Sequence, residues 1–123
     1  MIRLKDLLKE ELTDADIKVG DAYYRKTHVG YVVSFVYDKS IYGGWTTIEY
    51  QFKPQYGEPG FMVVGDGSAL GVDGYGKWPK VKVTSKMKKE MIKTLQDKNS
   101  EEVDVLKRND LRLSNVLSWV KRL

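Results

Sequence analysis

Residues 17–52, with the sequence IKVGDAYYRKTHVGYVVSFVYDKSIYGGWTTIEYQF, decide the fold that this chain is expected to adopt. The stretch contains two strands separated by a glycine and a third strand with clean alternation, each bounded by turn-forming residues. One side of the third strand carries Thr46, Ile48, Tyr50 and Phe52, and the other carries Trp45, Thr47, Glu49, Gln51 and Lys53. This pattern predicts a sheet with one face buried and the other in contact with water.

The strand expected at residues 30–37 has two largely apolar faces. One face carries Tyr31, Val33, Phe35 and Tyr37, and the other carries Val32, Ser34 and Val36. Such a strand is typical of a position covered on both sides, so we expect it to be central in the sheet. Short apolar strands at about 61–64 and 79–83 bring the expected total to about five.

Helical patterns lie on both sides of the strand region. Leucine and isoleucine recur at helical spacing in residues 2–12, and a second helix is expected from a cap at Thr84 or Ser85 to about Asp97. A third begins at Ser100, with a kink or a second start at 109–110. The expected fold class is α+β: a curved antiparallel sheet of about five strands, with an N-terminal helix and two C-terminal helices. The single domain spans 1–123, with its N-terminal helix at 1–13, its sheet at 17–83 and its helical region at 84–123.

Composition narrows the possible classes of protein. The 123 residues are 41% hydrophobic and 31% charged, which is typical of a globular domain that buries one core. Cysteine is absent from the sequence, which excludes disulfides, thiolate metal sites and thiol nucleophiles. The first residues lack the pattern of a secretory signal, and no run approaches the length of a membrane span. A cytoplasmic or virion-borne protein is therefore expected.

The order of features at residues 17–53 resembles the first strands of SH3-like small β-barrels. The similar features are the Ile17, Val19, Gly20 and Asp21 turn, the hydrophobic strand that Gly30 opens, and its partner strand at 45–53. The resemblance implies a small barrel and carries over no binding residue. The opening MIRLKDLLKEEL resembles in style the first residues of small tailed-bacteriophage proteins, which implies a phage accessory or virion protein, in the host cytoplasm or the particle.

The sequence contains no strong catalytic or metal-binding motif. His28 is the only histidine, and in a strand it is expected to be an ordinary polar side chain. Asp66 and Asp73 do not have the spacing of an EF-hand, and the glycines around them match no phosphate-binding pattern. Glu49 and Asp66 are the carboxylates that a hydrolase reading would use, but nothing in the sequence selects them. We expect no enzyme, no metal and no cofactor.

Lysine is concentrated in residues 77–98. This segment carries eight lysines against Glu90 and Asp97, in a chain whose net charge is only +4. Such a segment attracts phosphate backbones or acidic protein surfaces. The candidate nucleic-acid contacts are Lys82, Lys86, Lys89 and Lys93. Because lysine reads bases poorly, binding would involve the backbone with little sequence preference. A lysine-rich helix face that merely solubilises the chain is the competing explanation.

Aromatic residues near turns are the candidate contacts for a protein partner: Tyr42, Trp45, Tyr75 and Trp78. Trp45 is expected either to be an exposed anchor or to lie beneath a flanking helix. Trp119 either packs internally or mediates self-association. The sequence therefore predicts a non-catalytic protein-interaction module with a protein partner. The alternative is a nucleic-acid-binding module that uses the lysine segment.

Overall fold

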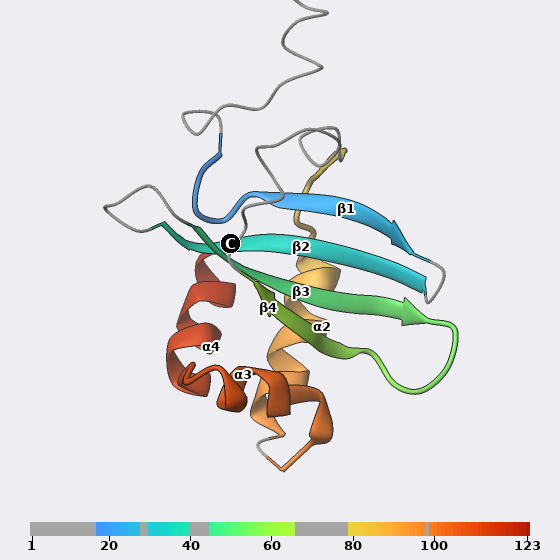
Figure 1. Cartoon of the computed structure of the whole chain (residues 1–123), viewed down its shortest axis with the longest axis vertical. Helices are drawn as coiled ribbons and strands as arrows, with labels where there is room; N and C mark the ends of the chain where they lie inside the picture. Colours follow the sequence, from blue (N-terminus) through green and yellow to red (C-terminus); the bar gives the residue numbers. More distant parts are fainter. Residues whose placement is uncertain (1–16, 28–29, 40–44, 66–78, 98) are drawn as a thin grey trace, which may run out of the picture.

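The structure, a computed structural model, describes residues 17–27, 30–39, 45–65, 79–97 and 99–123, with only the backbone described at 25–27 and 30 (Figure 1). The fold is α+β, with a five-stranded antiparallel sheet. The strands are β1 (Ala22–Thr27), β2 (Gly30–Lys39), β3 (Trp45–Pro54), β4 (Gly60–Gly65) and β5 (Lys80–Val81). Their order in the sheet is β4-β3-β2-β1-β5. The described strands pair as an open sheet, with β4 and β5 at opposite edges. The helix expected at 1–13 lies outside the described residues.

The helical part follows the sheet in the chain and covers one of its faces (Figure 1). It consists of α2 (Ser85–Gln96), the 3₁₀ helix η3 (Glu101–Val103), α3 (Asp104–Arg108) and α4 (Leu113–Arg122). The described helices do not include one with the length and apolarity that a bilayer crossing requires.

Local sequence signals explain where the helices begin and end. The Thr84 hydroxyl accepts a hydrogen bond from the backbone N–H of Met87 at 3.2 Å, so the predicted cap of α2 is confirmed. The helix expected after Ser100 is divided, and its second part begins at Leu113. The division follows from a Schellman ending of α3, in which Asp110 has a φ of 60° and the N–H of Leu111 reaches the Leu106 carbonyl at 2.9 Å.

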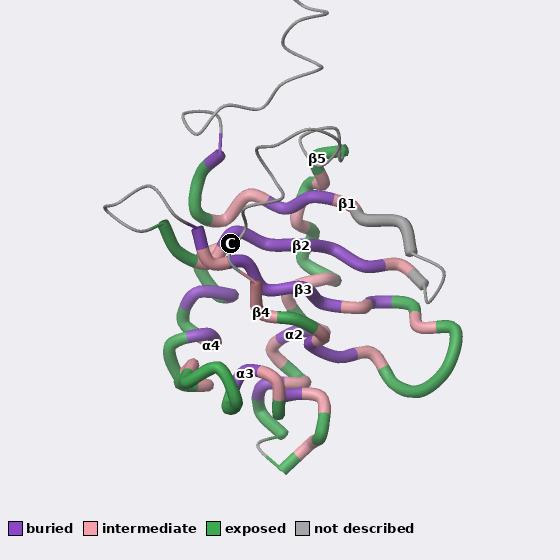
Figure 2. The backbone as a smooth tube through the Cα atoms, viewed as in Figure 1, coloured by how far each residue is buried: buried purple, intermediate pink, exposed green. Residues whose placement is uncertain are grey.

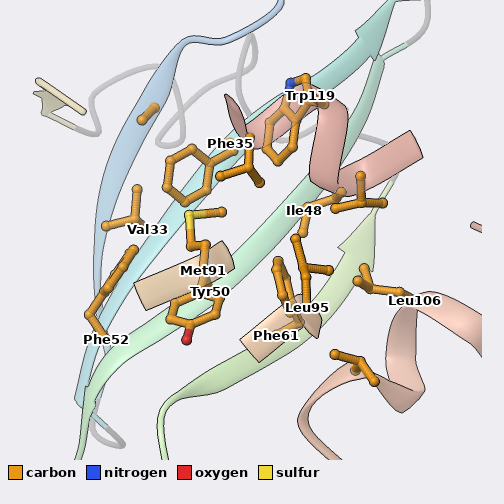
Figure 3. Close-up of a cluster of buried hydrophobic side chains, with 14 residues drawn as sticks. Val33, Phe35, Ile48, Tyr50, Phe52, Phe61, Met91, Leu95, Leu106 and Trp119 are labelled. Carbon is orange, nitrogen blue, oxygen red and sulfur yellow. The ribbon is translucent and has the colours of Figure 1, made fainter. Parts of the chain in front are cut away.

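The main core lies between the helices and the sheet (Figure 3). Phe35 of β2 packs edge-on against Trp119 of α4, with ring centroids 5.8 Å apart. Tyr50 of β3 packs in the same way against Phe61 of β4, at 4.8 Å. Met91 and Leu95 supply the buried side of α2. The face of β3 that the alternation assigned to the core is therefore the face that the helices cover.

Residues at the centre of the sheet are buried in succession along the strands (Figure 2), so side chains of the opposite face are buried as well. Its side chains at Tyr23, Val32, Ser34, Val36, Trp45, Thr47 and Glu49 are all buried. The central position expected of β2 is confirmed, because both of its faces are covered. The expectation that the second face of β3 is wet is wrong over its first half, where Thr47 and Glu49 are 6% and 5% exposed. Alternation shows which side chains share a face, but it does not show whether that face is covered.

Candidate functional site

Three of the four predicted protein-contact residues, Tyr42, Tyr75 and Trp78, lie outside the described residues. The fourth, Trp45, is 8% exposed and packs in a small cluster with Ile17, Tyr23 and Val36. This cluster lies on the sheet face opposite α2, α3 and α4, so Trp45 is not beneath one of these helices. A buried indole offers little contact area to a partner protein.

The four candidate lysines, Lys82, Lys86, Lys89 and Lys93, are all exposed. The last three lie on the side of α2 opposite its buried residues. Glu90 lies within the same surface, where the charges of Lys86 and Lys93 act on its carboxyl group. The lysines of α2 therefore form a basic surface whose charge is partly neutralised by Glu90.

Two other lysines of the segment take part in contacts within the chain. Lys88 donates through Nζ to the Leu123 carbonyl oxygen at 2.9 Å and to that of Lys121 at 3.2 Å, which ties α2 to the end of α4. Lys80 forms an ion pair with Asp21, with an N–O distance of 3.3 Å. The charge excess that is free to attract a partner is therefore smaller than the sequence count.

A hollow of about 500 Å³ lies between α4, the end of β2 and the turn at residues 18–21; we call it the α4 groove. Three separate chain segments form it. Its lining residues are Val19, Tyr37, Asp38, Asn115, Ser118, Trp119 and Arg122. The sequence analysis identified Trp119 alone as a possible contact and missed the groove.

The turn at 18–21 is fixed against β2 by backbone hydrogen bonds. Gly20 donates to the Val36 carbonyl at 2.8 Å, and Val36 donates in return to the Asp21 carbonyl at 2.8 Å. Gly20 has a φ of 95°, the left-handed conformation that favours glycine. The turn leaves Val19 52% exposed at the groove. An exposed aliphatic side chain is thus held rigidly beside the polar groups of α4.

Two aromatic rings form the inner part of the α4 groove. Tyr37 and Trp119 pack edge-on, with ring centroids 5.1 Å apart and an interplanar angle of 77°. Trp119 is only 3% exposed, and its indole Nε1 is buried without a hydrogen-bond partner in the described part of the chain. The rings give the groove a stable apolar floor, because Trp119 also packs against Phe35 in the core.

Opposite charges line the same groove. Burial raises the pKa of the Tyr37 phenol, the carboxylate of Asp38 raises it further, and the guanidinium of Arg122 opposes the shift. Tyr37 is therefore uncharged at neutral pH and able to donate or accept a hydrogen bond. Asp38 accepts a hydrogen bond from the backbone N–H of Lys39 at 2.9 Å. Within the described residues, neither Asp38 nor Arg122 forms an ion pair.

A second hollow, of about 390 Å³, lies beside α2 and contains several acidic groups. Its carboxylates are Glu58, Glu90, Asp97 and Glu102. The buried hydroxyl of Tyr50 at this hollow is already hydrogen-bonded to the Thr94 hydroxyl at 2.7 Å. Among the described residues, no three histidine or acidic side chains are placed to hold a metal ion. This arrangement is weaker as a binding site than the α4 groove.

The pairing of Glu49 and Asp66, the carboxylates considered for hydrolysis, involves a residue outside the described part of the chain. Glu49 is buried on the second face of the sheet, and Asp66 lies outside the described residues, as do His28 and Asp73. Comparisons with protein-family models, curated proteins and solved structures find no match to this chain, so the α4 groove is a candidate site on its geometry alone.

Proposed function

We propose that this chain is a non-catalytic protein-interaction module whose contact site is the α4 groove. The observation that supports this proposal is the meeting of Tyr37 and Arg122 beside the exposed Val19, above the buried ring of Trp119. Tyrosine and arginine are among the residue types that dominate the binding energy of protein interfaces. A groove with a rigid aromatic floor also loses little conformational entropy when a partner binds.

The phage-like style of residues 1–12 extends the proposal to a bacteriophage accessory or virion protein. The partner then belongs to the particle or to the host cell. The SH3-like resemblance of residues 17–53 adds the proposal that the sheet curves toward a small barrel.

The experiment uses a photo-crosslinking amino acid in place of Ser118, which is exposed at the groove. The captured protein is identified, purified and titrated calorimetrically against the unmodified chain. Arg122→Glu is expected to weaken the interaction at least tenfold, because truncating or reversing a central interface charge costs about 2 kcal/mol or more. Arg108→Glu is the matched control, since Arg108 is exposed on α3, away from the groove. Equal affinity of both variants for the purified partner would contradict the proposal.

The second candidate function is nucleic-acid binding through the exposed Lys82, Lys86, Lys89 and Lys93. The shared helix face of Lys86, Lys89 and Lys93 supports this function, and the neighbouring Glu90 argues against strong binding. The test is electrophoretic mobility shift with generic DNA and RNA at low and physiological salt. Binding that weakens with salt and is lost in the Lys86, Lys89 and Lys93 to Glu triple variant would support this function. A triple reversal of Lys53, Arg108 and Arg112 is the control of equal charge. If binding persists in both triple variants, or if the unmodified chain does not bind, the nucleic-acid-binding function is contradicted.

A further inference from the structure

The α4 groove also indicates the chemistry of the group it accepts, an inference that rests on the proposed function. Its donors are the Arg122 guanidinium, the Asn115 amide and the Tyr37 hydroxyl. Its acceptors include Asp38 and the oxygen of Ser118, whose own hydrogen is donated to the Ser114 carbonyl at 3.1 Å. Donors and acceptors are therefore both offered within one hollow.

The three donor and acceptor residues of α4 share one face of the helix. Asn115, Ser118 and Arg122 are separated by three and four residues, the spacing of neighbours on a helix surface. Asp38 is supplied by β2, on the other wall. The two charges of the groove therefore lie on different walls: the positive charge of Arg122 on α4 and the negative charge of Asp38 on β2.

The opposite charges of Arg122 and Asp38 make the groove a poor site for a simple anion such as phosphate. Arg122 and Asp38 both act on the Tyr37 phenol, which places one positive and one negative group around the same point. A phosphate that approaches Arg122 is also repelled by Asp38. A peptide that carries a carboxylate beside a main-chain N–H presents an acceptor for Arg122 and a donor for Asp38. Such a dipolar group satisfies both charges, which make no ion pair within the described residues.

We propose that the α4 groove binds a carboxylate of a partner peptide through Arg122 and Asn115, with an adjacent peptide N–H donated to Asp38. Val19 and the rim of Tyr37 contact an apolar side chain next to that carboxylate. The carboxylate comes from an acidic side chain or from a chain terminus, and the two sources share this chemistry.

Three N-acetylated dipeptides test the proposal by ¹⁵N-resolved NMR titration of the full chain. N-acetyl-glutamyl-leucinamide supplies a side-chain carboxylate, N-acetyl-glutaminyl-leucine a terminal carboxylate, and N-acetyl-glutaminyl-leucinamide neither. At least one carboxylate peptide is expected to bind about tenfold or more tightly than the uncharged one, because hydrogen bonds to a charged group are the stronger class. The shifts are expected at Asn115, Trp119 Nε1–H and Arg122. Comparison of the first two peptides identifies the source of the carboxylate.

Arg122→Gln is expected to remove the preference for the carboxylate, and Arg108→Gln is expected to retain it. Arg122→Lys keeps the charge without the planar fork and is expected to retain only part of the preference. Equal binding of all three peptides, shifts outside the groove, or a preference that survives in Arg122→Gln would overturn the proposal. If Arg122→Glu still blocks a purified protein partner in that case, the interaction function stands and only the carboxylate chemistry fails.

Discussion

Replacing Gly60 with alanine tests how closely β4 approaches η3. Gly60 is buried at the start of β4 and pairs with Gln51 of β3. A Cβ atom at this position would lie 2.5 Å from both Cβ and Cγ of Glu102, and 3.2 Å from its Cα. Because Cβ and Cα of Glu102 are fixed by the backbone of η3, a rotamer change cannot relieve the clash. The strand or the 3₁₀ helix must move.

Two opposing effects set the magnitude. Forcing an extra methyl group into a filled site costs about 1–3 kcal/mol. The reduced freedom of the unfolded chain returns about 0.4–1 kcal/mol, because Gly60 is not among the glycines with positive φ. We therefore expect Gly60→Ala to lower the free energy of unfolding by about 1–2 kcal/mol. For a domain of this size the melting temperature should fall by about 3–10 °C.

The assay is urea unfolding followed by tryptophan fluorescence, in a double-mutant cycle with Glu102→Gly. Glu102→Gly removes both side-chain carbons from the clash, so Gly60→Ala is expected to cost much less stability in that background. Glu102→Ala keeps Cβ, so it is expected to reduce the cost of Gly60→Ala by less. Gly57→Ala is the backbone control: Gly57 has a φ of 81° and nothing within 4 Å of its added Cβ, so its loss of stability comes from backbone strain alone and should show no coupling to Glu102→Gly. A Gly60→Ala loss below about 0.5 kcal/mol, or no coupling to Glu102→Gly, would refute the reasoning.

Three further changes test the buried Tyr50, the half-buried Glu90 and one helix end. Burial raises the pKa of Tyr50 to about 12, so the difference between the ultraviolet phenolate titrations of the unmodified chain and Tyr50→Phe should have its midpoint there. Burial also raises the pKa of Glu90, against the charges of Lys86 and Lys93, so the folded state holds this proton more tightly than the unfolded state. Glu90→Gln should therefore raise the free energy of unfolding at neutral pH, and the gain should vanish as the pH falls below the ordinary glutamate pKa. Asp110 adopts a φ of 60° after α3, so Asp110→Gly should stabilise the fold by about 0.5–1 kcal/mol in urea unfolding.

Each of these expectations has a contradicting result. A Tyr50 midpoint near the ordinary value of 10.0 would mean that its hydroxyl is not buried as described. An effect of Glu90→Gln that does not change with pH would show that desolvation of its charge is not the cause. A loss of stability in Asp110→Gly would show that the aspartate side chain contributes more than its backbone conformation costs.

The sequence predicted the elements that depend on local interactions. The strand at 45–53, the cap at Thr84 and the break at 109–110 all follow from residues that are neighbours in the chain. Helix capping and side-chain alternation depend on a few residues that are close together in the chain, so a short stretch of sequence is enough to recognise them. The approximate bounds of the described strands could be predicted for the same reason.

The groove could not be predicted in this way, and the sequence left the burial of Trp45 as one of two alternatives. Asn115, Ser118 and Arg122 have the pattern of an ordinary helix surface, and they line a groove only because α4 lies against the end of β2. The polar neighbours of Trp45 indicated a wet face, but the indole packs with Val36 and Ile17. Both features depend on contacts between segments distant in the chain, which leave no local pattern.

The strand order has a consequence for how the chain assembles. β1, β2, β3 and β4 lie side by side in chain order, so their pairing closes only short loops and is entropically inexpensive. β5 instead joins β1 from far along the chain, through two residue pairs and the Tyr24 N–H bond to the Pro79 carbonyl at 2.8 Å. The four-strand meander is therefore expected to form first and β5 to dock last. In native-state hydrogen exchange, the amide of Tyr24 should accordingly open without global unfolding, while the amides shared by β2 and β3 exchange slowest.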